Sequence, residues 1–138
     1  MNEPHIKKEE YLKKLTPEQV NVCHLAGTEP PFSGKWNTNH EMGMYTCSVC
    51  EAQLFRSETK FDSSTGWPAF DDVVRSDAVE ITQDYSFGMT RTAVNCKNCG
   101  SHLGHLFDDA QTKTGKYYCI NSVSLDFKPW GVGPQNVL

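Results

Sequence analysis

The hydrophobic positions of the N-terminal segment, about residues 5–26, recur with a helical spacing. A short surface helix is predicted over residues 7–15, where one face would be apolar. A second helix is predicted to begin at Thr16, because Thr16 and Gln19 can form a capping box around a proline at the first helical position. It is expected to end at Gly27. Its apolar side chains would be Val20, Val22, Cys23 and Leu25.

After Gly27 the helical spacing disappears. Glycines and prolines separate short runs rich in β-branched and aromatic residues, a pattern typical of antiparallel β-structure over about residues 27–138. The clearest alternation spans residues 115–127, and it predicts one long strand. One face of this strand would carry Tyr117, Cys119, Asn121, Val123, Leu125 and Phe127.

Length and composition indicate an ordinary globular protein. The chain has 138 residues, so we expect a single domain over residues 1–138, and we expect a monomer. It has no apolar run near the ~20 residues that cross a membrane. Its net charge is −4 and its basic residues are scattered, which argues against a nucleic-acid partner. The first 14 residues lack a secretory signal, so we expect a reducing compartment, the cytoplasm.

Four of the six cysteines form two Cys-x-x-Cys pairs, Cys47 with Cys50 and Cys96 with Cys99. Four thiolates satisfy the tetrahedral preference of zinc and leave no open position, so the pairs predict one structural Zn²⁺. Forty-five residues separate the pairs, and a metal between them would close a long loop. The alternative is that one or both pairs are redox dithiols. A disulfide framework is disfavoured, because such frameworks are typical of short exported chains.

Cys119 is the candidate nucleophile among the two remaining cysteines. A cysteine in a strand is often a small core residue. Here Asn121 follows on the same predicted face, and its amide could donate a hydrogen bond to a thiolate. From the local residues, a catalytic and a core role stay equally open.

His102 and His105 follow directly on the second cysteine pair. On a regular strand, residues three apart point to opposite faces, but a bulge at Gly104 would turn both histidines into one pocket. Since zinc already has four better ligands, acid–base chemistry is a more specific interpretation of the two histidines than metal binding. A purely structural role for one of them is the alternative.

Two further segments combine aromatic residues with rigid turns. Residues 66–70, Gly-Trp-Pro-Ala-Phe, place Trp67 and Phe70 where they could form a wall that binds a small apolar group, or where they could be core residues. Residues 27–34 read as a turn that packs on the fold, with no chemistry of their own.

In this order, the paired cysteines, Gly-Trp-Pro-Ala-Phe, His-Leu-Gly-His and Tyr-Cys-Ile-Asn-Ser resemble the methionine-R-sulfoxide reductases of the B type. The resemblance extends from Leu15 to about Phe127. It implies a zinc-stapled, β-tent-like fold of two antiparallel sheets with short N-terminal helices. It also implies that thioredoxin supplies electrons. The residues that match the active site of the family are Cys119 as nucleophile, Trp67, His102, His105 and Asn121.

The resemblance implies repair of the R epimer of methionine sulfoxide in oxidised proteins. Cys119 would attack the sulfoxide sulfur while His105, helped by His102, protonates the leaving oxygen. Methionine would leave and Cys119 would become a sulfenic acid. Trp67 would pack against the methyl group of the substrate.

Two positions depart from the family pattern. Many members have a resolving cysteine directly before Gly-Trp-Pro, whereas this chain has Thr65. Cys23 is then the remaining candidate for resolving the sulfenic acid, with a packed core residue as the alternative. Tyr117 stands where arginine is common, so an ion pair of that arginine with the acidic residues after His105 is missing, and Tyr117 is expected beside the substrate.

Two rival classes remain. One is a binding module on the same fold, with an aromatic cage around Trp67; such a module needs neither Cys119 nor both histidines. The other is a zinc ribbon that docks proteins or nucleic acid, which the acidic balance disfavours.

Overall fold

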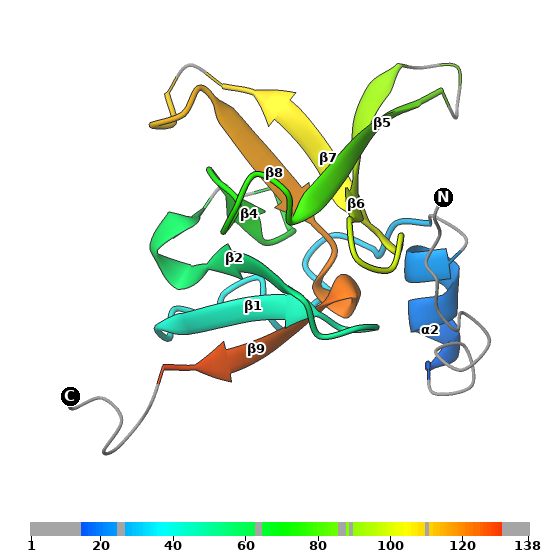
Figure 1. Cartoon of the computed structure of the whole chain (residues 1–138), viewed down its shortest axis with the longest axis horizontal. Helices are drawn as coiled ribbons and strands as arrows, with labels where there is room; N and C mark the ends of the chain where they lie inside the picture. Colours follow the sequence, from blue (N-terminus) through cyan, green and yellow to red (C-terminus); the bar gives the residue numbers. More distant parts are fainter. Residues whose placement is uncertain are drawn as a thin grey trace.

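The computed structural model describes residues 15–24, 27–62, 65–85, 88, 90–109 and 111–130. These residues form two antiparallel sheets with one short helical segment beside them (Figure 1). The prediction of a mainly β fold with two antiparallel sheets is therefore confirmed. The helix predicted over residues 7–15 lies almost entirely outside the described residues.

The helical segment starts as α2 (Pro17–Gln19) and continues as one π-helical turn, η1 (Val20–His24). Its capping box is the predicted one: Gln19 N donates to Thr16 Oγ1 at 3.1 Å, and Thr16 N donates to Gln19 Oε1 at 2.9 Å. Beyond the segment, Gly27 N donates to Asn21 O, so the chain has left the helix by Gly27 as expected.

The smaller sheet has the strand order β2-β1-β9. Its strands are β1 (Gly43–Cys47), β2 (Gln53–Arg56) and β9 (Leu125–Pro129), with β1 in the middle. Every residue of β1 is buried, which is why this strand shows no alternation of polar and apolar residues.

The larger sheet has the order β3-β4-β8-β7-β6-β5. One of its faces packs on the core, and the other carries the polar residues of the candidate site. Two 3₁₀ turns, η2 (Ser57–Thr59) and η4 (Ser122–Ser124), connect strands. The strands are β3 (Lys60–Phe61), β4 (Ala69–Phe70), β5 (Val79–Asp84), β6 (Arg91–Cys96), β7 (His102–Asp108) and β8 (Lys116–Ile120).

The prediction of one long strand over residues 115–127 is wrong. The chain ends β8 at Ile120, turns through η4 and enters β9 in the other sheet. The side chains in between bond the backbone instead of continuing a ladder: Asn121 Nδ2 donates to Leu103 O, and Ser124 Oγ donates to His102 O. The segment therefore links the two sheets immediately after Cys119.

The core lies between the sheets and is rich in aromatic rings. Phe70 is fully buried there and stacks on Phe55, with 4.4 Å between ring centroids. The expectation that Phe70 lines a substrate pocket is thereby corrected: it follows Ala69 on the opposite face of β4, and alternation sends it into the core.

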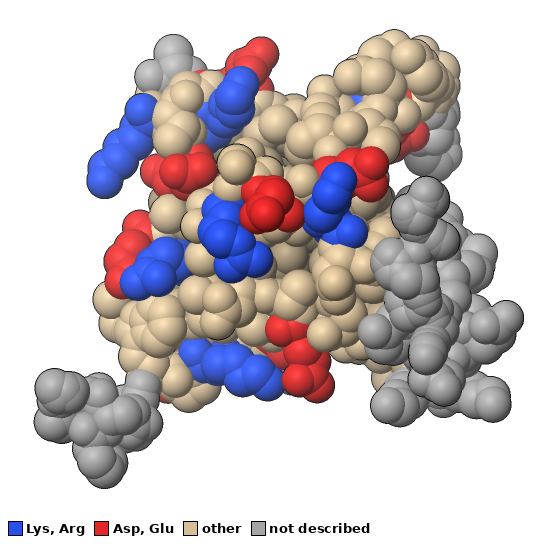
Figure 2. Space-filling model, viewed as in Figure 1, with Lys and Arg blue, Asp and Glu red and all other residues tan. Residues whose placement is uncertain are grey.

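Surface charges of both signs are interleaved over the face shown in Figure 2. Among the described residues, no helix has the length and apolar character needed to span a membrane.

Candidate active site and metal centre

Four cysteine thiols gather where the two sheets meet. Cys47 ends β1 of the smaller sheet, and Cys96 ends β6 of the larger one. The sulfur atoms of the two Cys-x-x-Cys pairs all lie within 4.8 Å of one another. The pairs that are 45 residues apart in sequence therefore form one cluster, as predicted.

The geometry of this cluster fits a tetrahedral metal ion. The Cys47–Cys99 and Cys50–Cys96 sulfur separations are 3.7 and 3.6 Å. Metal–sulfur bonds of about 2.3 Å give a tetrahedron with edges of about 3.8 Å. Four thiolates at such distances repel strongly unless a cation lies between them. The four cysteines can therefore hold one metal ion with no position left for a substrate.

A β-bulge in β7 brings the two histidines onto one face. Val94 of β6 pairs with Gly104, but the next residue, Asn95, pairs with His102, so β7 contains one extra residue. The His102 and His105 rings consequently lie 5.3 Å apart, edge to face. The predicted bulge is confirmed.

Cys119 and His105 are direct cross-strand partners. The register of β7 against β8 pairs these two residues, and directly opposite side chains share a face of the sheet. On the other side of β8, Cys119 pairs with Ala69, whose small side chain leaves room above the thiol. Cys119, the candidate nucleophile, thus lies beside His105, the candidate acid, and Cys119 is partly exposed.

Asp84, at the end of β5, holds the His105 ring. His105 Nε2 donates to Asp84 Oδ2 at 2.9 Å, and Arg91 Nη2 donates to the same oxygen at 3.3 Å. Asp84 and Arg91 were not indicated by the sequence, because they reach the site only through the pairing of β5 with β6, which the local pattern does not reveal. The carboxylate fixes the orientation of the ring and leaves Nδ1 for proton transfer.

His102 is buried and neutral. Burial, together with the charge of His105, lowers its pKa to about 4. Its Nδ1 lies 3.4 Å from Asn95 Oδ1, which as an acceptor places the ring proton on Nδ1. Nε2 is then an acceptor, and it has no hydrogen-bond partner among the described residues.

The Cys119 thiol is held mainly in its protonated form. Burial raises the pKa of the thiol, the Thr65 hydroxyl lowers it, and the charge of Glu29 raises it. Thr65 Oγ1 lies 3.9 Å from the Cys119 sulfur. The residue that stands in place of the common resolving cysteine therefore contacts the candidate nucleophile.

Glu29 is a third residue of the site that the sequence pattern did not indicate. Its main chain binds two predicted site residues: Glu29 N donates to Asn121 Oδ1 at 2.9 Å, and Glu29 O accepts from Trp67 Nε1 at 3.0 Å. Its buried carboxylate accepts from Val123 N at 3.0 Å. Asn121 and Trp67 are thus oriented by one residue of a segment to which no role was assigned.

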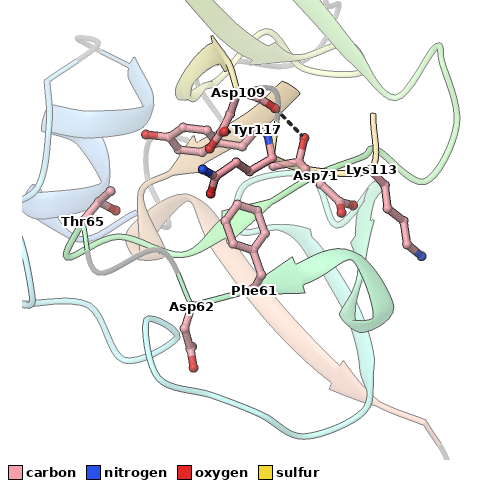
Figure 3. A pocket seen from close by; sticks show the side chains of 9 residues that line it. Phe61, Asp62, Thr65, Asp71, Asp109, Lys113 and Tyr117 are labelled. Carbon is pink, nitrogen blue, oxygen red and sulfur yellow. Dashed lines mark hydrogen bonds between the residues drawn. The ribbon is translucent and has the colours of Figure 1, made fainter. Parts of the chain in front are cut away.

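Tyr117 lines a cavity of about 470 Å³ beside the nucleophile (Figure 3). Its ring contacts Phe61 edge to face at 6.0 Å and Phe107 at 5.2 Å. Burial and the nearby Cys119 and Asp109 raise the pKa of its hydroxyl. The residue that replaces arginine therefore adds an uncharged aromatic wall. The cavity is also lined by Phe61, Asp62, Thr65, Asp71, Asp109, Gln111, Thr112 and Lys113.

Cys23 lies on the metal side of the protein. Its sulfur is 3.6 Å from Ser124 Oγ and 3.9 Å from Ser48 Oγ, and only 4% of the residue is exposed. Burial raises the pKa of this thiol. Any reaction with Cys119 would require η1 to move away from η4.

The fold and the site define a class: a two-sheet β protein with a four-cysteine cluster that can hold a metal ion and a cysteine that is paired with a carboxylate-held histidine. A family model described as "SelR domain" matches residues 15–129. The chain is 55% identical, over 92% of its length, to the peptide methionine sulfoxide reductase MsrB of Methanosarcina barkeri, of which it covers 89%.

A second relative, the peptide methionine sulfoxide reductase MsrB of Leifsonia xyli, is 54% identical over 88% of this chain and 88% of that protein. The mitochondrial methionine-R-sulfoxide reductase B3 of Mus musculus is 53% identical over 88% of this chain, which covers 48% of that longer protein. The chain belongs to the SelR family of B-type methionine-R-sulfoxide reductases.

Proposed function

We propose that this protein reduces the R epimer of methionine sulfoxide in oxidised proteins to methionine. The observation that carries the proposal is the cross-strand pair of Cys119 and His105, with His105 held by Asp84. A binding module has no need of a thiol beside an oriented histidine. Membership of the SelR family supports the same activity.

The reaction transfers one oxygen atom. The Cys119 sulfur bonds to the sulfoxide sulfur, and the oxygen then passes from that sulfur to the Cys119 sulfur. The new sulfur–sulfur bond and the original sulfur–oxygen bond both break, which leaves methionine and a Cys119 sulfenic acid. Cysteine loses two electrons and methionine sulfoxide gains them. The thiol gives up one proton and the sulfenic acid carries one proton, so no other reactant is consumed in this half-reaction.

Proton transfer accompanies the attack. Because burial raises the pKa of Cys119, little thiolate is present before the substrate binds. His105, whose Nε2 is held by Asp84, moves protons between the thiol and the leaving oxygen through Nδ1. Neutral His102 accepts a hydrogen bond from the protonated oxygen through Nε2.

Trp67 and Asn121 orient the substrate. Trp67, anchored through its indole nitrogen to Glu29, packs against the substrate methyl group, and Tyr117 lines the cavity that also contains Thr65. Asn121 uses one N–H for Leu103 O and retains a second for developing charge at the site. In the S epimer the methyl group and the oxygen exchange places. Neither group would then fit its subsite, so the S epimer would be rejected.

The metal is one Zn²⁺ held by the four clustered cysteines, which supplies a cross-link between the sheets and takes no part in the oxygen transfer. The protein acts as a monomer in the reducing cytoplasm, and its domain spans residues 1–138. Reduction of the sulfenic acid by thioredoxin consumes two thiols and releases water.

Cys23 resolves the sulfenic acid in this scheme, forming a disulfide with Cys119 that thioredoxin reduces. Because Cys23 packs against Ser124 and Ser48, the step requires displacement of η1. Peptide mapping after one equivalent of substrate should recover a Cys23–Cys119 cross-link. Recovery of the sulfenic acid without that cross-link, at a thioredoxin-dependent rate unchanged in Cys23→Ser, would end the resolving role.

A single-turnover experiment tests the oxygen transfer. Reduced Cys23→Ser protein, which lacks the proposed resolving thiol, should convert one equivalent of the R sulfoxide without thioredoxin, and a 1,3-dione, which traps sulfenic acids, should label Cys119. Cys119→Ser should form no methionine while keeping its metal. Label on another cysteine, or methionine formation by Cys119→Ser, would contradict the mechanism.

A further inference from the structure

Residues 29–32 are fastened to the rim of the active site but take no part in the oxygen transfer. The main chain of Glu29 binds Asn121 and Trp67. Three residues later, Phe32 N donates to Gly66 O at 2.7 Å. The segment therefore keeps a fixed position beside the substrate pocket.

Phe32 is both strained and exposed. Its φ of 64° lies in the left-handed region, which is uncommon for residues other than glycine and costs about 1 kcal/mol or more. Nevertheless Phe32 is 69% exposed, so burial of its side chain in the core does not offset the cost of the strained backbone. Strained backbone of this kind concentrates at ligand-contacting sites.

The Phe32 ring lies over Gly66. A Cβ atom added at Gly66 would come within 3.0 Å of two ring carbons and 2.6 Å of Pro31. Gly66 stands between Thr65, which contacts the Cys119 sulfur, and Trp67. The exposed ring thus lies over the turn that carries Thr65 and Trp67.

We propose that Phe32 docks an apolar side chain that neighbours the methionine sulfoxide in the substrate polypeptide. The inference rests on the proposed function. When a sulfoxide side chain reaches Cys119, the flanking residues must pass over the rim, and a rigid aromatic ring binds apolar groups at a low entropic cost.

The charges around Phe32 favour an apolar occupant. Pro30, Pro31 and Ser33 are uncharged, and Glu29 is buried. Lys35, the next cation along the chain, lies over the Trp36 ring at 4.8 Å. The segment thus presents no charge that would select a charged neighbour of the sulfoxide.

Competing substrates test the contact. We compare the N-acetyl methylamide of methionine R-sulfoxide with short peptides in which the sulfoxide is flanked by leucine, alanine, glutamate or lysine. The wild type should show the highest kcat/KM for the leucine peptide. In Phe32→Asn, which tolerates a positive φ, the ratio of leucine peptide to methylamide should fall about fivefold, equivalent to about 1 kcal/mol.

Stability and a matched variant separate docking from folding. Phe32→Gly should lose the same preference, keep its turnover of the methylamide and melt no lower than the wild type, because glycine adopts a positive φ without strain. Met42→Ala, which removes an exposed apolar side chain directly before β1 of the other sheet, should leave the ratio unchanged.

Three outcomes would overturn the inference. They are an unchanged ratio in both Phe32 variants, an equal loss for methylamide and peptide together with a lower melting temperature, and a preference for the lysine peptide, which would point to the acidic cavity of Figure 3. Turnover of the methylamide by the wild type establishes the proposed function separately, so the two can fail independently.

Discussion

His102 shows how burial sets the chemistry of a single residue. Its ring is 5% exposed, and its pKa falls to about 4 from the 6.5 expected in the unfolded chain. The unfolded chain therefore takes up a proton first as the pH falls. Stability contributed by neutral His102 is complete above pH 6.5 and is lost as the pH falls towards 4.

We predict a pH-dependent stability difference between the wild type and His102→Gln. Between pH 7 and pH 4.5, the wild type should lose about 2 to 3 kcal/mol more of its free energy of unfolding than the variant. Denaturant unfolding at several pH values measures this, and any pH dependence of the cysteine cluster is common to both proteins. Parallel curves would contradict the assignment of a buried, neutral His102.

Thr65 allows the resolving route to be rebuilt. Because its hydroxyl lies 3.9 Å from the Cys119 sulfur, Thr65→Cys should form a disulfide with Cys119 after one turnover. The variant should then be independent of Cys23. Peptide mapping in a Cys23→Ser background measures this, with Thr65→Ser as the control. Persistence of free sulfenic acid in Thr65→Cys would show that the two positions cannot approach.

Local residue identity left a core or structural role open for Cys119, His102 and His105, and the family resemblance singled out all three as candidates. The pairing of β6, β7 and β8 brings them together. Neither the local residues nor the resemblance indicated Asp84 or Glu29. Aspartate and glutamate are common on surfaces, and only the pairing of β5 with β6 and the turn before Pro30 bring these two to the site. Phe70 was misassigned because β4 has only two residues, and alternation cannot be recognised in the sequence over so short a strand.

Among the elements, the bulge in β7 determines the active site. It turns His102 and His105 to one face, while Gly104 lies against the main chain of Cys119. A glycine between two histidines signalled this bulge in the sequence. The break between β8 and β9 was not signalled, since Asn121 and Ser122 continue an alternating pattern and only their backbone bonds to other segments end the strand.

We predict that Gly104→Ala disrupts the pairing of β7 with β8. A Cβ atom at this position would overlap the carbonyl group of Cys119, and backbone cannot move aside as a flexible side chain can. The free energy of unfolding should fall by about 3 kcal/mol or more, with loss of activity. Asp108→Ala, at an exposed site on the same strand, should change stability by less than about 0.5 kcal/mol. Equal stability of the two variants would contradict the close contact.

For the whole molecule, the cysteine cluster is a second link between the two sheets, beside the chain segment that joins β8 to β9. Cys47 and Cys96 are fully buried at the ends of β1 and β6. Without a cation, the four sulfur atoms of the cluster would be crowded together in the core. The paired Cys-x-x-Cys motifs predicted this link. The sequence pattern did not predict which strands join each sheet, because that depends on long-range pairing such as β1 with β9.

Removal of the metal should destabilise the whole fold. We expect about one zinc per chain by atomic spectroscopy, and a loss of at least about 3 kcal/mol in the free energy of unfolding after chelation or in Cys47→Ser. Cys23→Ser, which removes a buried thiol outside the cluster, should retain the zinc. A metal-free wild-type protein of unchanged stability would refute a structural metal.

The most direct measurement is turnover of the R and S epimers of methionine sulfoxide, each as a peptide-like amide, with thioredoxin as reductant. We expect reduction of the R epimer alone, and loss of that activity in Cys119→Ser. Reduction of the S epimer, or no turnover of either epimer by folded, zinc-loaded protein, would contradict the proposed function.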